Sequence, residues 1–238
     1  AHVNASSVII SATKFLGDML VRNGIDAGLV RIIPYGVDIG NVARRPPVPS
    51  RFTAAAPLRL AFMGNMVEIK GPHIVLEALA ALGDRAREIS LHLYGQGNPD
   101  NPYFREIRAK VERLDGMAVL TGTFPHDRIG EIMSDHHLVI VPSLWYESTP
   151  LVLCSALAAR IPALVSRLGG MTEIIEEGIN GISFPSGDVD GLRDVLLRLL
   201  DAPEILARLH RTIVARRRFT ADYVDDVEAV YFEIRKAE

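Results

Sequence analysis

Five short apolar segments alternate with helical patterns along this chain of 238 residues. Each segment is bounded by glycine, proline or serine; they are residues 58–63, 90–94, 118–120, 138–141 and 162–165. Continuous apolar runs of this length are typical of strands that are buried on both faces of a sheet. The alternation therefore predicts an α/β fold in which a parallel sheet carries helices on both faces.

Parallel sheets of this Rossmann-like kind bind ligands in the crevice outside the carboxyl ends of their strands. The loops that follow the five segments carry Gly64, Gly95, Gly122, Glu147 and Gly169. Because the carboxyl ends of parallel strands meet at one edge, we expect these loops to lie close together there.

Residues 147–173 carry the strongest functional signal. They are interpreted as a loop with the carboxylate of Glu147, a helix opened by Thr149 and Pro150, a buried strand at 161–166, and a second helix opened by Gly169-Gly170. A helix N-terminus presents unpaired N–H groups and partial positive charge, which suits phosphate. A carboxylate in the same place suits sugar hydroxyls, so the segment predicts a nucleotide-sugar site.

The composition excludes several other classes of protein. Hydrophobic residues make up 48% and charged residues 23%, as in ordinary globular proteins. A net charge of −3 argues against a nucleic-acid partner. The single cysteine, Cys154, excludes an internal disulfide, fits a reducing compartment and is expected to be a packing residue. No apolar run approaches the roughly 20 residues of a membrane span. The start, Ala1-His2, is not a signal peptide, so we expect a fragment of a longer chain.

A family resemblance emerges from the order of the motifs. The segment I-P-Y-G-V-D at 33–38 resembles the I-P-N-G-V-D linker of family 4 retaining glycosyltransferases, which have the GT-B fold. Six further motifs follow in the family's order over about 120 residues: Gly64 with Lys70-Gly71, Tyr94-Gly95-Gln96-Gly97, Val141-Pro142-Ser143, Glu147 to Leu151, Gly169-Gly170 with Glu173, and Gly178 with Gly181. The W-Y-E-S-T-P version is similar to the branch that builds bacterial surface polysaccharides. The resemblance runs from about Val8 to the end.

The resemblance implies a domain organisation. Residues 1–33 would be the remnant of an N-terminal acceptor domain, 34–57 an interdomain linker, 58–218 the donor-binding domain and 219–238 a C-terminal crossover helix. The acceptor half would be missing, so the fragment alone is not expected to transfer sugar. The implied partners are a nucleotide diphosphate sugar and a lipid-linked or glycan acceptor. No cofactor or metal is expected. The implied location is the cytoplasm, including the inner face of the plasma membrane.

Four side chains take roles from the resemblance. Glu147 matches the first glutamate of the E-x7-E signature and would orient the donor sugar as the catalytic carboxylate; the alternative is a helix cap. Lys70 would contact the diphosphate; the alternative is a solvated surface lysine. Two positions depart from the family. Asn65 stands where an arginine is common, and it lacks the charge and the bidentate fork. Ser155 stands where the second glutamate would grip the ribose, so serine would bind weakly or through water.

The remaining donor-binding residues are backbone and loop positions. The first turn of the helix after Glu147 would offer N–H groups to phosphate, while its leucine and valine side chains, with Leu153, pack inward. Glycines after the second strand would permit close backbone approach or form a plain turn. Residues after the third strand would hold the base between the backbone and an apolar side chain. In the same order, the three groups are Ser148, Thr149, Leu151 and Val152 for the phosphate; Gly95 and Gly97 for the turn; and Thr121, Gly122, Thr123 and Phe124 for the base.

Other features are given plainer interpretations. His136-His137 is expected to be structural, and Asp188-Val189-Asp190 to cap a helix without binding metal. The basic cluster of Arg208, Arg211 and Arg216–Arg218 is either a solvated helix face or a contact with anionic lipid. Trp145-Tyr146 either stacks on a sugar or fills its loop.

The main hypothesis is therefore the donor-binding domain of a retaining hexosyltransferase-type enzyme. The departures at Ser155 and Asn65 motivate a second hypothesis, a non-catalytic nucleotide-sugar-binding or scaffold module of the same fold. A GT-B enzyme of another reaction, such as a sugar-nucleotide epimerase, is a third.

Overall fold

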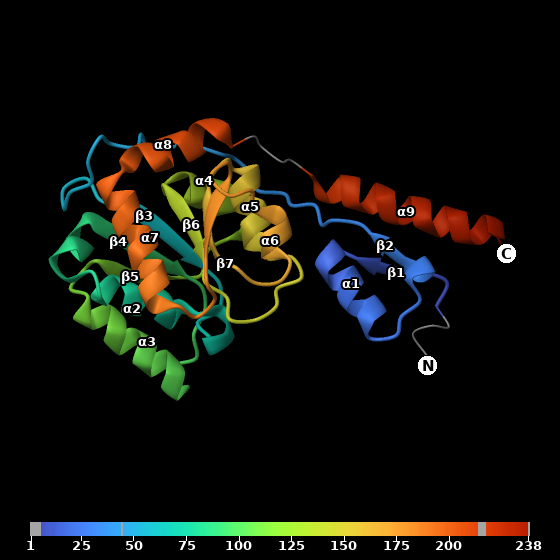
Figure 1. The fold of residues 1–238 in the computed structure, drawn as a ribbon, viewed down its shortest axis with the longest axis horizontal. Helices are drawn as coiled ribbons and strands as arrows, with labels where there is room; N and C mark the ends of the chain where they lie inside the picture. The colour runs from blue at the N-terminus through green and yellow to red at the C-terminus, as the bar shows by residue number, and fades with distance from the viewer. Residues whose placement is uncertain (1–5, 44, 214–217, 238) are drawn as a thin grey trace.

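A computed structural model describes residues 6–43, 45–213 and 218–237 (Figure 1). Its main body is a six-stranded sheet in the order β5-β4-β3-β6-β7-β8, and all five pairings are parallel. The strands are β3 (Leu58–Met63), β4 (Ile89–Tyr94), β5 (Ala118–Gly122), β6 (Leu138–Val141), β7 (Ala163–Ser166) and β8 (Gly181–Phe184). The predicted parallel sheet is confirmed.

The strand order has one reversal. The chain starts the sheet at β3, builds β4 and β5 on one side, and then crosses back to build β6, β7 and β8 on the other. Strands β3 and β6 are therefore neighbours, with Leu60 opposite Leu138 and Phe62 opposite Ile140. At such a reversal the connections leave in opposite directions and open a crevice at the carboxyl ends of the two strands.

Alternate residues of each strand build two cores. Leu60 and Phe62 of β3 belong to one, and Ala61 and Met63 to the other, as the two-residue period of a strand requires. The first core is covered by α2 (Pro72–Ala80), α3 (Pro102–Arg113), α7 (Val189–Asp201) and α8 (Pro203–Thr212). The second is covered by α4 (Ile129–Ser134), α5 (Leu151–Ala158) and α6 (Met171–Ile174). Helices thus lie on both faces, as the sequence predicts.

Strand β8 was not among the five predicted strands. It has four residues, begins with Gly181 and alternates Ile182 and Phe184 with a partly exposed serine, so it lacks a continuous apolar run. A Cβ at Gly181 would lie 2.4 Å from the carbonyl oxygen of Ala163 on β7. The glycine is therefore required by close strand contact.

The N-terminal residues form a small separate unit, which we call the N-terminal module. It comprises β1 (Ile9–Ser11), α1 (Lys14–Arg22), the 3-10 turn η2 (Ala27–Leu29) and β2 (Val30–Ile32). The two strands pair in parallel, Ile9 opposite Val30. The expected strand at 8–11 and helix near 14–23 are confirmed, while β2, which lies within the residues 1–33 interpreted as the acceptor-domain remnant, was not predicted. The proposed domain boundaries stay a prediction.

The last helix, α9 (Thr220–Ala237), lies beside this module (Figure 1). Its start is fixed to the segment after β2, because the Val37 amide donates to the carbonyl of Arg218 at 2.8 Å. The Arg218 guanidinium donates in turn to the carbonyl of Pro34 at 2.7 Å. The rings of Tyr35 and Tyr223 meet edge to face at 5.5 Å. The predicted helix at 219–236 is confirmed.

Candidate functional site

Lys70 and Glu147 meet at the reversal of strand order. Lys70 ends a 3-10 turn, η3 (Glu68–Lys70), after β3, and Glu147 lies in the loop between β6 and α5. They are 77 residues apart in sequence, yet the Lys70 ammonium donates to Oε1 of Glu147 in an ion pair. The Ser143 hydroxyl donates to the same oxygen at 2.8 Å. The Glu147 side chain is only 12% exposed, so the pair is screened less than a surface pair would be.

This pair excludes both plain alternatives from the sequence. Glu147 does not cap the next helix, since α5 begins at Leu151 with Pro150 as its N-cap and has no side-chain cap. Lys70 is not a free surface lysine, since its ammonium is paired. The ion pair itself and the role of Ser143 were missed. The signal for Ser143 was its place directly after the fourth strand, in the motif Val141-Pro142-Ser143.

Gly71 allows the two loops to approach. It has φ +69°, in the left-handed region, and a Cβ there would lie 2.1 Å from the carbonyl oxygen of Pro142. The Leu144 amide donates to the carbonyl of Ile69 at 2.9 Å. The backbone after β3 is therefore held directly against the backbone after β6, and Lys70 is carried to Glu147.

Gly169 and Gly170 hold the other side of the Glu147 loop. The Gly170 amide donates to the carbonyl of Glu147 at 2.9 Å. A Cβ at Gly170 would lie 2.0 Å from the carbonyl oxygen of Ser148, and Gly169 has φ +59°. The glycine pair predicted to open a helix thus also packs on the loop that carries the carboxylate, and α6 follows directly at Met171.

The start of α5 supplies free backbone donors. The Pro150 carbonyl accepts from the amides of Leu153 and Cys154, at 2.9 and 3.2 Å. Within the described residues, no hydrogen bond involves the amides of Leu151 and Val152. The Leu151 side chain is 55% exposed, so the prediction that it packs inward is wrong, whereas Leu153 is fully buried as expected.

Ser148 and Thr149 complete the same loop. Both are half-buried, and the Thr149 hydroxyl oxygen is buried without a hydrogen-bond partner in the described structure. A cavity of about 20 Å³ lies beside the ion pair and is lined by Lys70, Ser143 and Glu147, together with Phe62, Met63, Ile140, Val141, Pro142, Pro150 and Val152. This cavity has room for only about one water molecule beside the pair.

Ser155 does not line this cavity. It lies inside α5 and is 2% exposed, among the residues packed on the sheet. Asn65, the other departure from the family pattern, is exposed in the loop after β3. The structure therefore brings Asn65 to the expected edge of the sheet but leaves Ser155 within the packed helix.

Gly95 and Gly97 follow β4 at the same edge. A Cβ at Gly95, where φ is +142°, would lie 1.9 Å from the carbonyl oxygen of Gly64, and one at Gly97 would lie 2.2 Å from the ring of Phe104. Both glycines are thus required by contacts within the protein, in agreement with the plainer interpretation of this motif as a turn.

The four residues proposed to hold the base lie at the end of β5. Thr121 and Gly122 are the last residues of the strand, and the Gly122 carbonyl accepts from the Gly95 amide at 2.9 Å. Thr123 is exposed, and the Phe124 ring meets Tyr94 edge to face at 5.6 Å. This segment shares the carboxyl edge of the sheet with Lys70 but lies two strands away from β3.

The aromatic pair before Glu147 does not fill its loop. Trp145 is 60% and Tyr146 62% exposed. The Tyr146 ring stacks on Phe15 of α1, with centroids 5.7 Å apart and planes at 18°. This contact with the N-terminal module was not predicted, because no local pattern relates Phe15 to a loop so distant in sequence.

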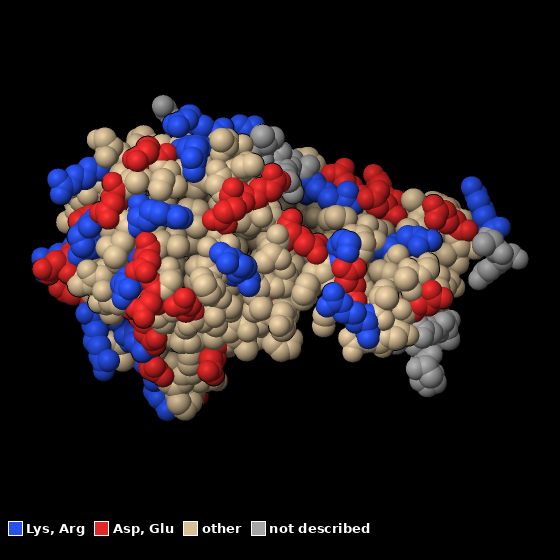
Figure 2. All heavy atoms as spheres, viewed as in Figure 1, with Lys and Arg blue, Asp and Glu red and all other residues tan. Residues whose placement is uncertain are grey.

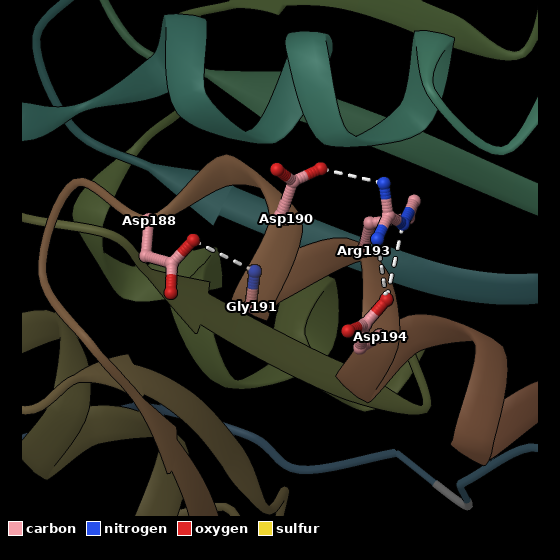
Figure 3. Close-up of polar contacts among 5 residues, drawn as sticks. All are labelled: Asp188, Asp190, Gly191, Arg193 and Asp194. Atoms are coloured by element: carbon pink, nitrogen blue, oxygen red, sulfur yellow. Dashed lines mark hydrogen bonds and ion pairs between the residues drawn. The ribbon is translucent and has the colours of Figure 1, made fainter.

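The Asp188-Val189-Asp190 segment caps a helix, as predicted (Figure 3). The Asp188 carboxylate accepts from the Gly191 amide at 2.8 Å, and Asp190 pairs with Arg193 at 2.5 Å. In the described ranges, no group of three or more His, Cys, Asp or Glu side chains is arranged to hold a metal ion.

His136 and His137 are structural, as predicted. They are 1% and 4% exposed. His136 is hydrogen-bonded to His92 at 2.9 Å and to the Ile132 carbonyl at 2.7 Å. Burial lowers the pKa of each to about 4. Cys154 is also largely enclosed, and burial raises the pKa of its thiol to about 11, which disfavours the reactive thiolate.

The surface carries both signs of charge. On the face shown in Figure 2, basic and acidic side chains are interspersed over the main body. Arg208 and Arg211 are exposed on α8, Arg218 is engaged with Pro34, and Arg216–Arg217 lie outside the described residues. None of the helices described is long and apolar enough to cross a membrane.

The fold and this edge define a Rossmann-like domain of the GT-B type. Residues 57–202 match the family described as Glycosyl transferases group 1. Because the match covers more than half of the chain, the protein belongs to that glycosyltransferase family.

Several characterised relatives are similar. The α-D-kanosaminyltransferase of Streptomyces kanamyceticus is 28% identical over 172 residues, which are 72% of this chain and 44% of the relative. The glycogen synthase of Mycobacterium tuberculosis is 27% identical over 222 residues, 93% of this chain and 51% of that protein. The chain thus spans about half the length of the curated relatives it matches. HepE of Anabaena, solved with UDP and glucose, superposes with a TM-score of 0.81 at 20% identity, over 96% of this chain and 64% of that one; this likeness shows the fold.

Proposed function

We propose that the chain is the donor-binding half of a retaining glycosyltransferase that uses a nucleotide diphosphate sugar. The observation that carries the proposal is the meeting of Lys70 and Glu147 at the reversal of strand order. A cation for a diphosphate and a carboxylate for sugar hydroxyls lie there beside the amides of Leu151 and Val152, which have no partner among the described residues. Structures of HepE hold UDP, UDP with glucose, and UDP-glucose on the same fold, which supports this class of ligand.

The ion pair gives the site a simple exchange mechanism. In the free protein Glu147 neutralises Lys70. An incoming diphosphate replaces Glu147 as the partner of the Lys70 ammonium, and the amides at the start of α5 bind the diphosphate oxygens. The carboxylate is then released towards the sugar, and Ser143 keeps its Oε1 oriented. As the glycosidic bond breaks with oxocarbenium character, the diphosphate gains charge, and the same cation and amides stabilise it. No metal is needed in this scheme.

The acceptor side is proposed to lie in an N-terminal half. The chain spans about half of its curated relatives, so acceptor-binding groups are expected from that half, and this chain alone is not expected to transfer sugar. Relatives named for colanic acid and amylovoran biosynthesis support a role in surface polysaccharide formation. We propose a hexose as the transferred sugar, a lipid-linked or glycan acceptor, and a cytoplasmic location that includes the inner face of the plasma membrane.

The proposal is tested by calorimetric titration of UDP, GDP, ADP and TDP. One of them should bind with a Kd near 0.1 mM, about −5.5 kcal/mol. Lys70→Ala should weaken it about tenfold or more, since a hydrogen bond to a charged group contributes about 1.5–3 kcal/mol. Glu147→Gln should bind the diphosphate at least as tightly as the parent chain, because the competing carboxylate is gone.

Lys110→Ala is the matched control. Lys110 is also paired, with Glu77 and Glu106, but it lies on α3, so its loss should leave nucleotide affinity unchanged. Equal affinity of the Lys70→Ala and Lys110→Ala variants would contradict the site.

A non-catalytic binding or scaffold module is the second candidate. Ser155 in place of the second signature glutamate, buried within α5, favours it, because a strong ribose contact is absent. The same titrations separate the enzyme from a scaffold module that has lost nucleotide binding. Ser155→Glu tests the lost contact, since it should tighten binding if serine is a loss and weaken binding if the site has been rebuilt around serine. Failure of all four nucleotides to bind, repeated with the full-length protein, would support the scaffold module over the enzyme.

A further inference from the structure

The first turn of α1 makes two contacts with the loops of the candidate donor site. Phe15 stacks on Tyr146, the residue before Glu147. The Lys14 amide donates to Oε2 of Glu173 at 3.0 Å, across 159 residues of sequence. Figure 1 shows the N-terminal module at the end of the main body where α6 lies.

The aromatic contact reaches Glu147 through a tight turn. The Glu147 amide donates to the Trp145 carbonyl at 2.8 Å, a three-residue turn centred on Tyr146. In such a turn the backbone angles of the central residue fix the direction of the next side chain. A Tyr146 ring held against Phe15 therefore restricts the orientation of Glu147.

The second contact reaches Glu147 through α6. Glu173 belongs to α6, a helix of only four residues that follows Gly169-Gly170. The Gly170 amide donates to the Glu147 carbonyl. A carboxylate at the N-terminus of α1 is also favoured by the helix dipole, so α6 is tied to the module at one end and to the Glu147 loop at the other.

Both contacts lie at the surface. Tyr146 is 62% exposed, Glu173 is exposed and Phe15 is half-buried. Contacts of this kind contribute little to a hydrophobic core, but they can bias a loop between arrangements. Both contacts lead to the backbone of the same residue, Glu147, one through its amide and one through its carbonyl, which points to positioning rather than to core packing.

We propose that the first turn of α1 is a positioning element of the donor site. Phe15 and the Lys14 amide hold the β6–α5 loop and α6, and thereby set the orientation of Glu147 towards the sugar. Movement of the N-terminal module relative to the main body then changes sugar binding while the Lys70 contact with phosphate persists. The inference rests on the proposed function for its ligand, whereas the link between α1 and the loop stands on geometry alone.

Trp145 is the single tryptophan of the chain and lies in the loop concerned, so its fluorescence anisotropy reports the loop directly. Phe15→Ala should lower the Trp145 anisotropy in the free protein. It should also weaken UDP-glucose binding by about twofold to twelvefold, the range for loss of an aromatic pair, with little change for UDP. Phe15→Tyr keeps a ring and should restore both properties.

Phe232→Ala is the matched control, because Phe232 is 58% exposed on α9 and should change neither readout. Glu173→Leu tests the second contact independently and should also lower the anisotropy. Unchanged anisotropy in both Phe15→Ala and Glu173→Leu would overturn the proposal. So would equal losses of UDP and UDP-glucose affinity. If the parent chain bound none of UDP, GDP, ADP and TDP, the proposed function would fail, and the anisotropy of the free variants would still decide whether α1 holds the loop.

Discussion

Glu147 uses one carboxylate oxygen for its two contacts within the protein. Lys70 and Ser143 both donate to Oε1, and no hydrogen bond within the described residues involves Oε2. Ser143 is 1% exposed, so its hydroxyl is a fixed donor that survives when Lys70 turns to a ligand. The carboxylate thus keeps one anchored oxygen and one oxygen available to a sugar hydroxyl.

Arg160 has an unfavourable backbone conformation. Its φ is +58°, and it follows α5 in a Schellman turn, in which the Ile161 amide donates to the Ala156 carbonyl at 2.8 Å and the Arg160 amide to Leu157 at 3.0 Å. Glycine is preferred at this position because it lacks a Cβ.

Arg160→Gly is therefore expected to raise the free energy of unfolding by about 0.5–1 kcal/mol, the relief of strain less the added freedom of the unfolded chain. Urea denaturation measures it. Arg160→Ala keeps the Cβ and serves as the control. If both variants gain equally, removal of the guanidinium explains the gain and the strain argument is wrong.

Helix α9 is fixed mainly at its first turns. Tyr223 contacts Tyr35, whereas Val224, Tyr231 and Phe232 are 44%, 63% and 58% exposed. An 18-residue helix with so much exposed apolar surface depends on its few tertiary contacts, because most helical stability in proteins comes from tertiary packing rather than from propensity.

Tyr223→Ala should consequently increase amide hydrogen exchange along α9, while Tyr231→Ala, a matched loss of an exposed tyrosine, should not. Exchange measured by mass spectrometry on both variants is the test. Equal protection in the two would show that the Tyr35 contact does not hold the helix.

The sequence predicts the elements whose pattern is local. Segments such as 58–63 and 138–141 are continuous apolar runs, and both are strands of the central sheet. Strand β8 was missed because its Gly181 is explained only by the approach of Ala163 from a neighbouring strand. The start of α5 was placed slightly early, because Pro150 acts as the N-cap rather than as a helical residue.

For the candidate site, motif order identified Lys70 and Glu147, but not their pairing. That contact depends on β3 lying beside β6 and on Gly71 touching Pro142, and neither property is a pattern in one segment. The stacking of Phe15 on Tyr146 could not be predicted from the sequence for the same reason.

His137, which is buried, and His210, which is half-buried, link distant parts of the molecule. His137 Nδ1 accepts from the Arg59 amide at 3.0 Å, its Nε2 faces the Pro47 carbonyl at 3.3 Å, and its own carbonyl is bonded to His210 at 2.7 Å. Burial lowers the pKa of His136, His137 and His210 to about 4. Protonation of His137 at Nδ1 would break the bond from Arg59.

These shifts make stability depend on pH. Each histidine is neutral in the folded protein down to about pH 4 but becomes protonated near pH 6.5 when unfolded. The unfolded state then binds more protons, so the free energy of unfolding should be level above pH 6.5 and fall as the pH drops towards 4.

His137→Asn keeps an acceptor for the Arg59 amide without titrating, and it should reduce this fall in the free energy of unfolding. Urea melts at pH 7, 5.5 and 4.5 would measure it, and a slope equal to that of the parent chain would contradict the assignment.

The reversal of strand order also affects how the sheet can form while the chain is being synthesised on the ribosome. Strand β3 is the first strand of the six-stranded sheet to be synthesised, yet it lies in the middle of that sheet. After β4 and β5 have paired on one side of it, its other edge stays unpaired until β6 is synthesised. The 77 residues between Lys70 and Glu147 take about 4–15 s to translate at 5–20 residues per second. During that interval a nascent chain presents an open apolar strand edge, the kind of surface that chaperones protect. A nucleotide can assist folding only after the start of α5 has left the exit tunnel, because half of its candidate site does not exist before then.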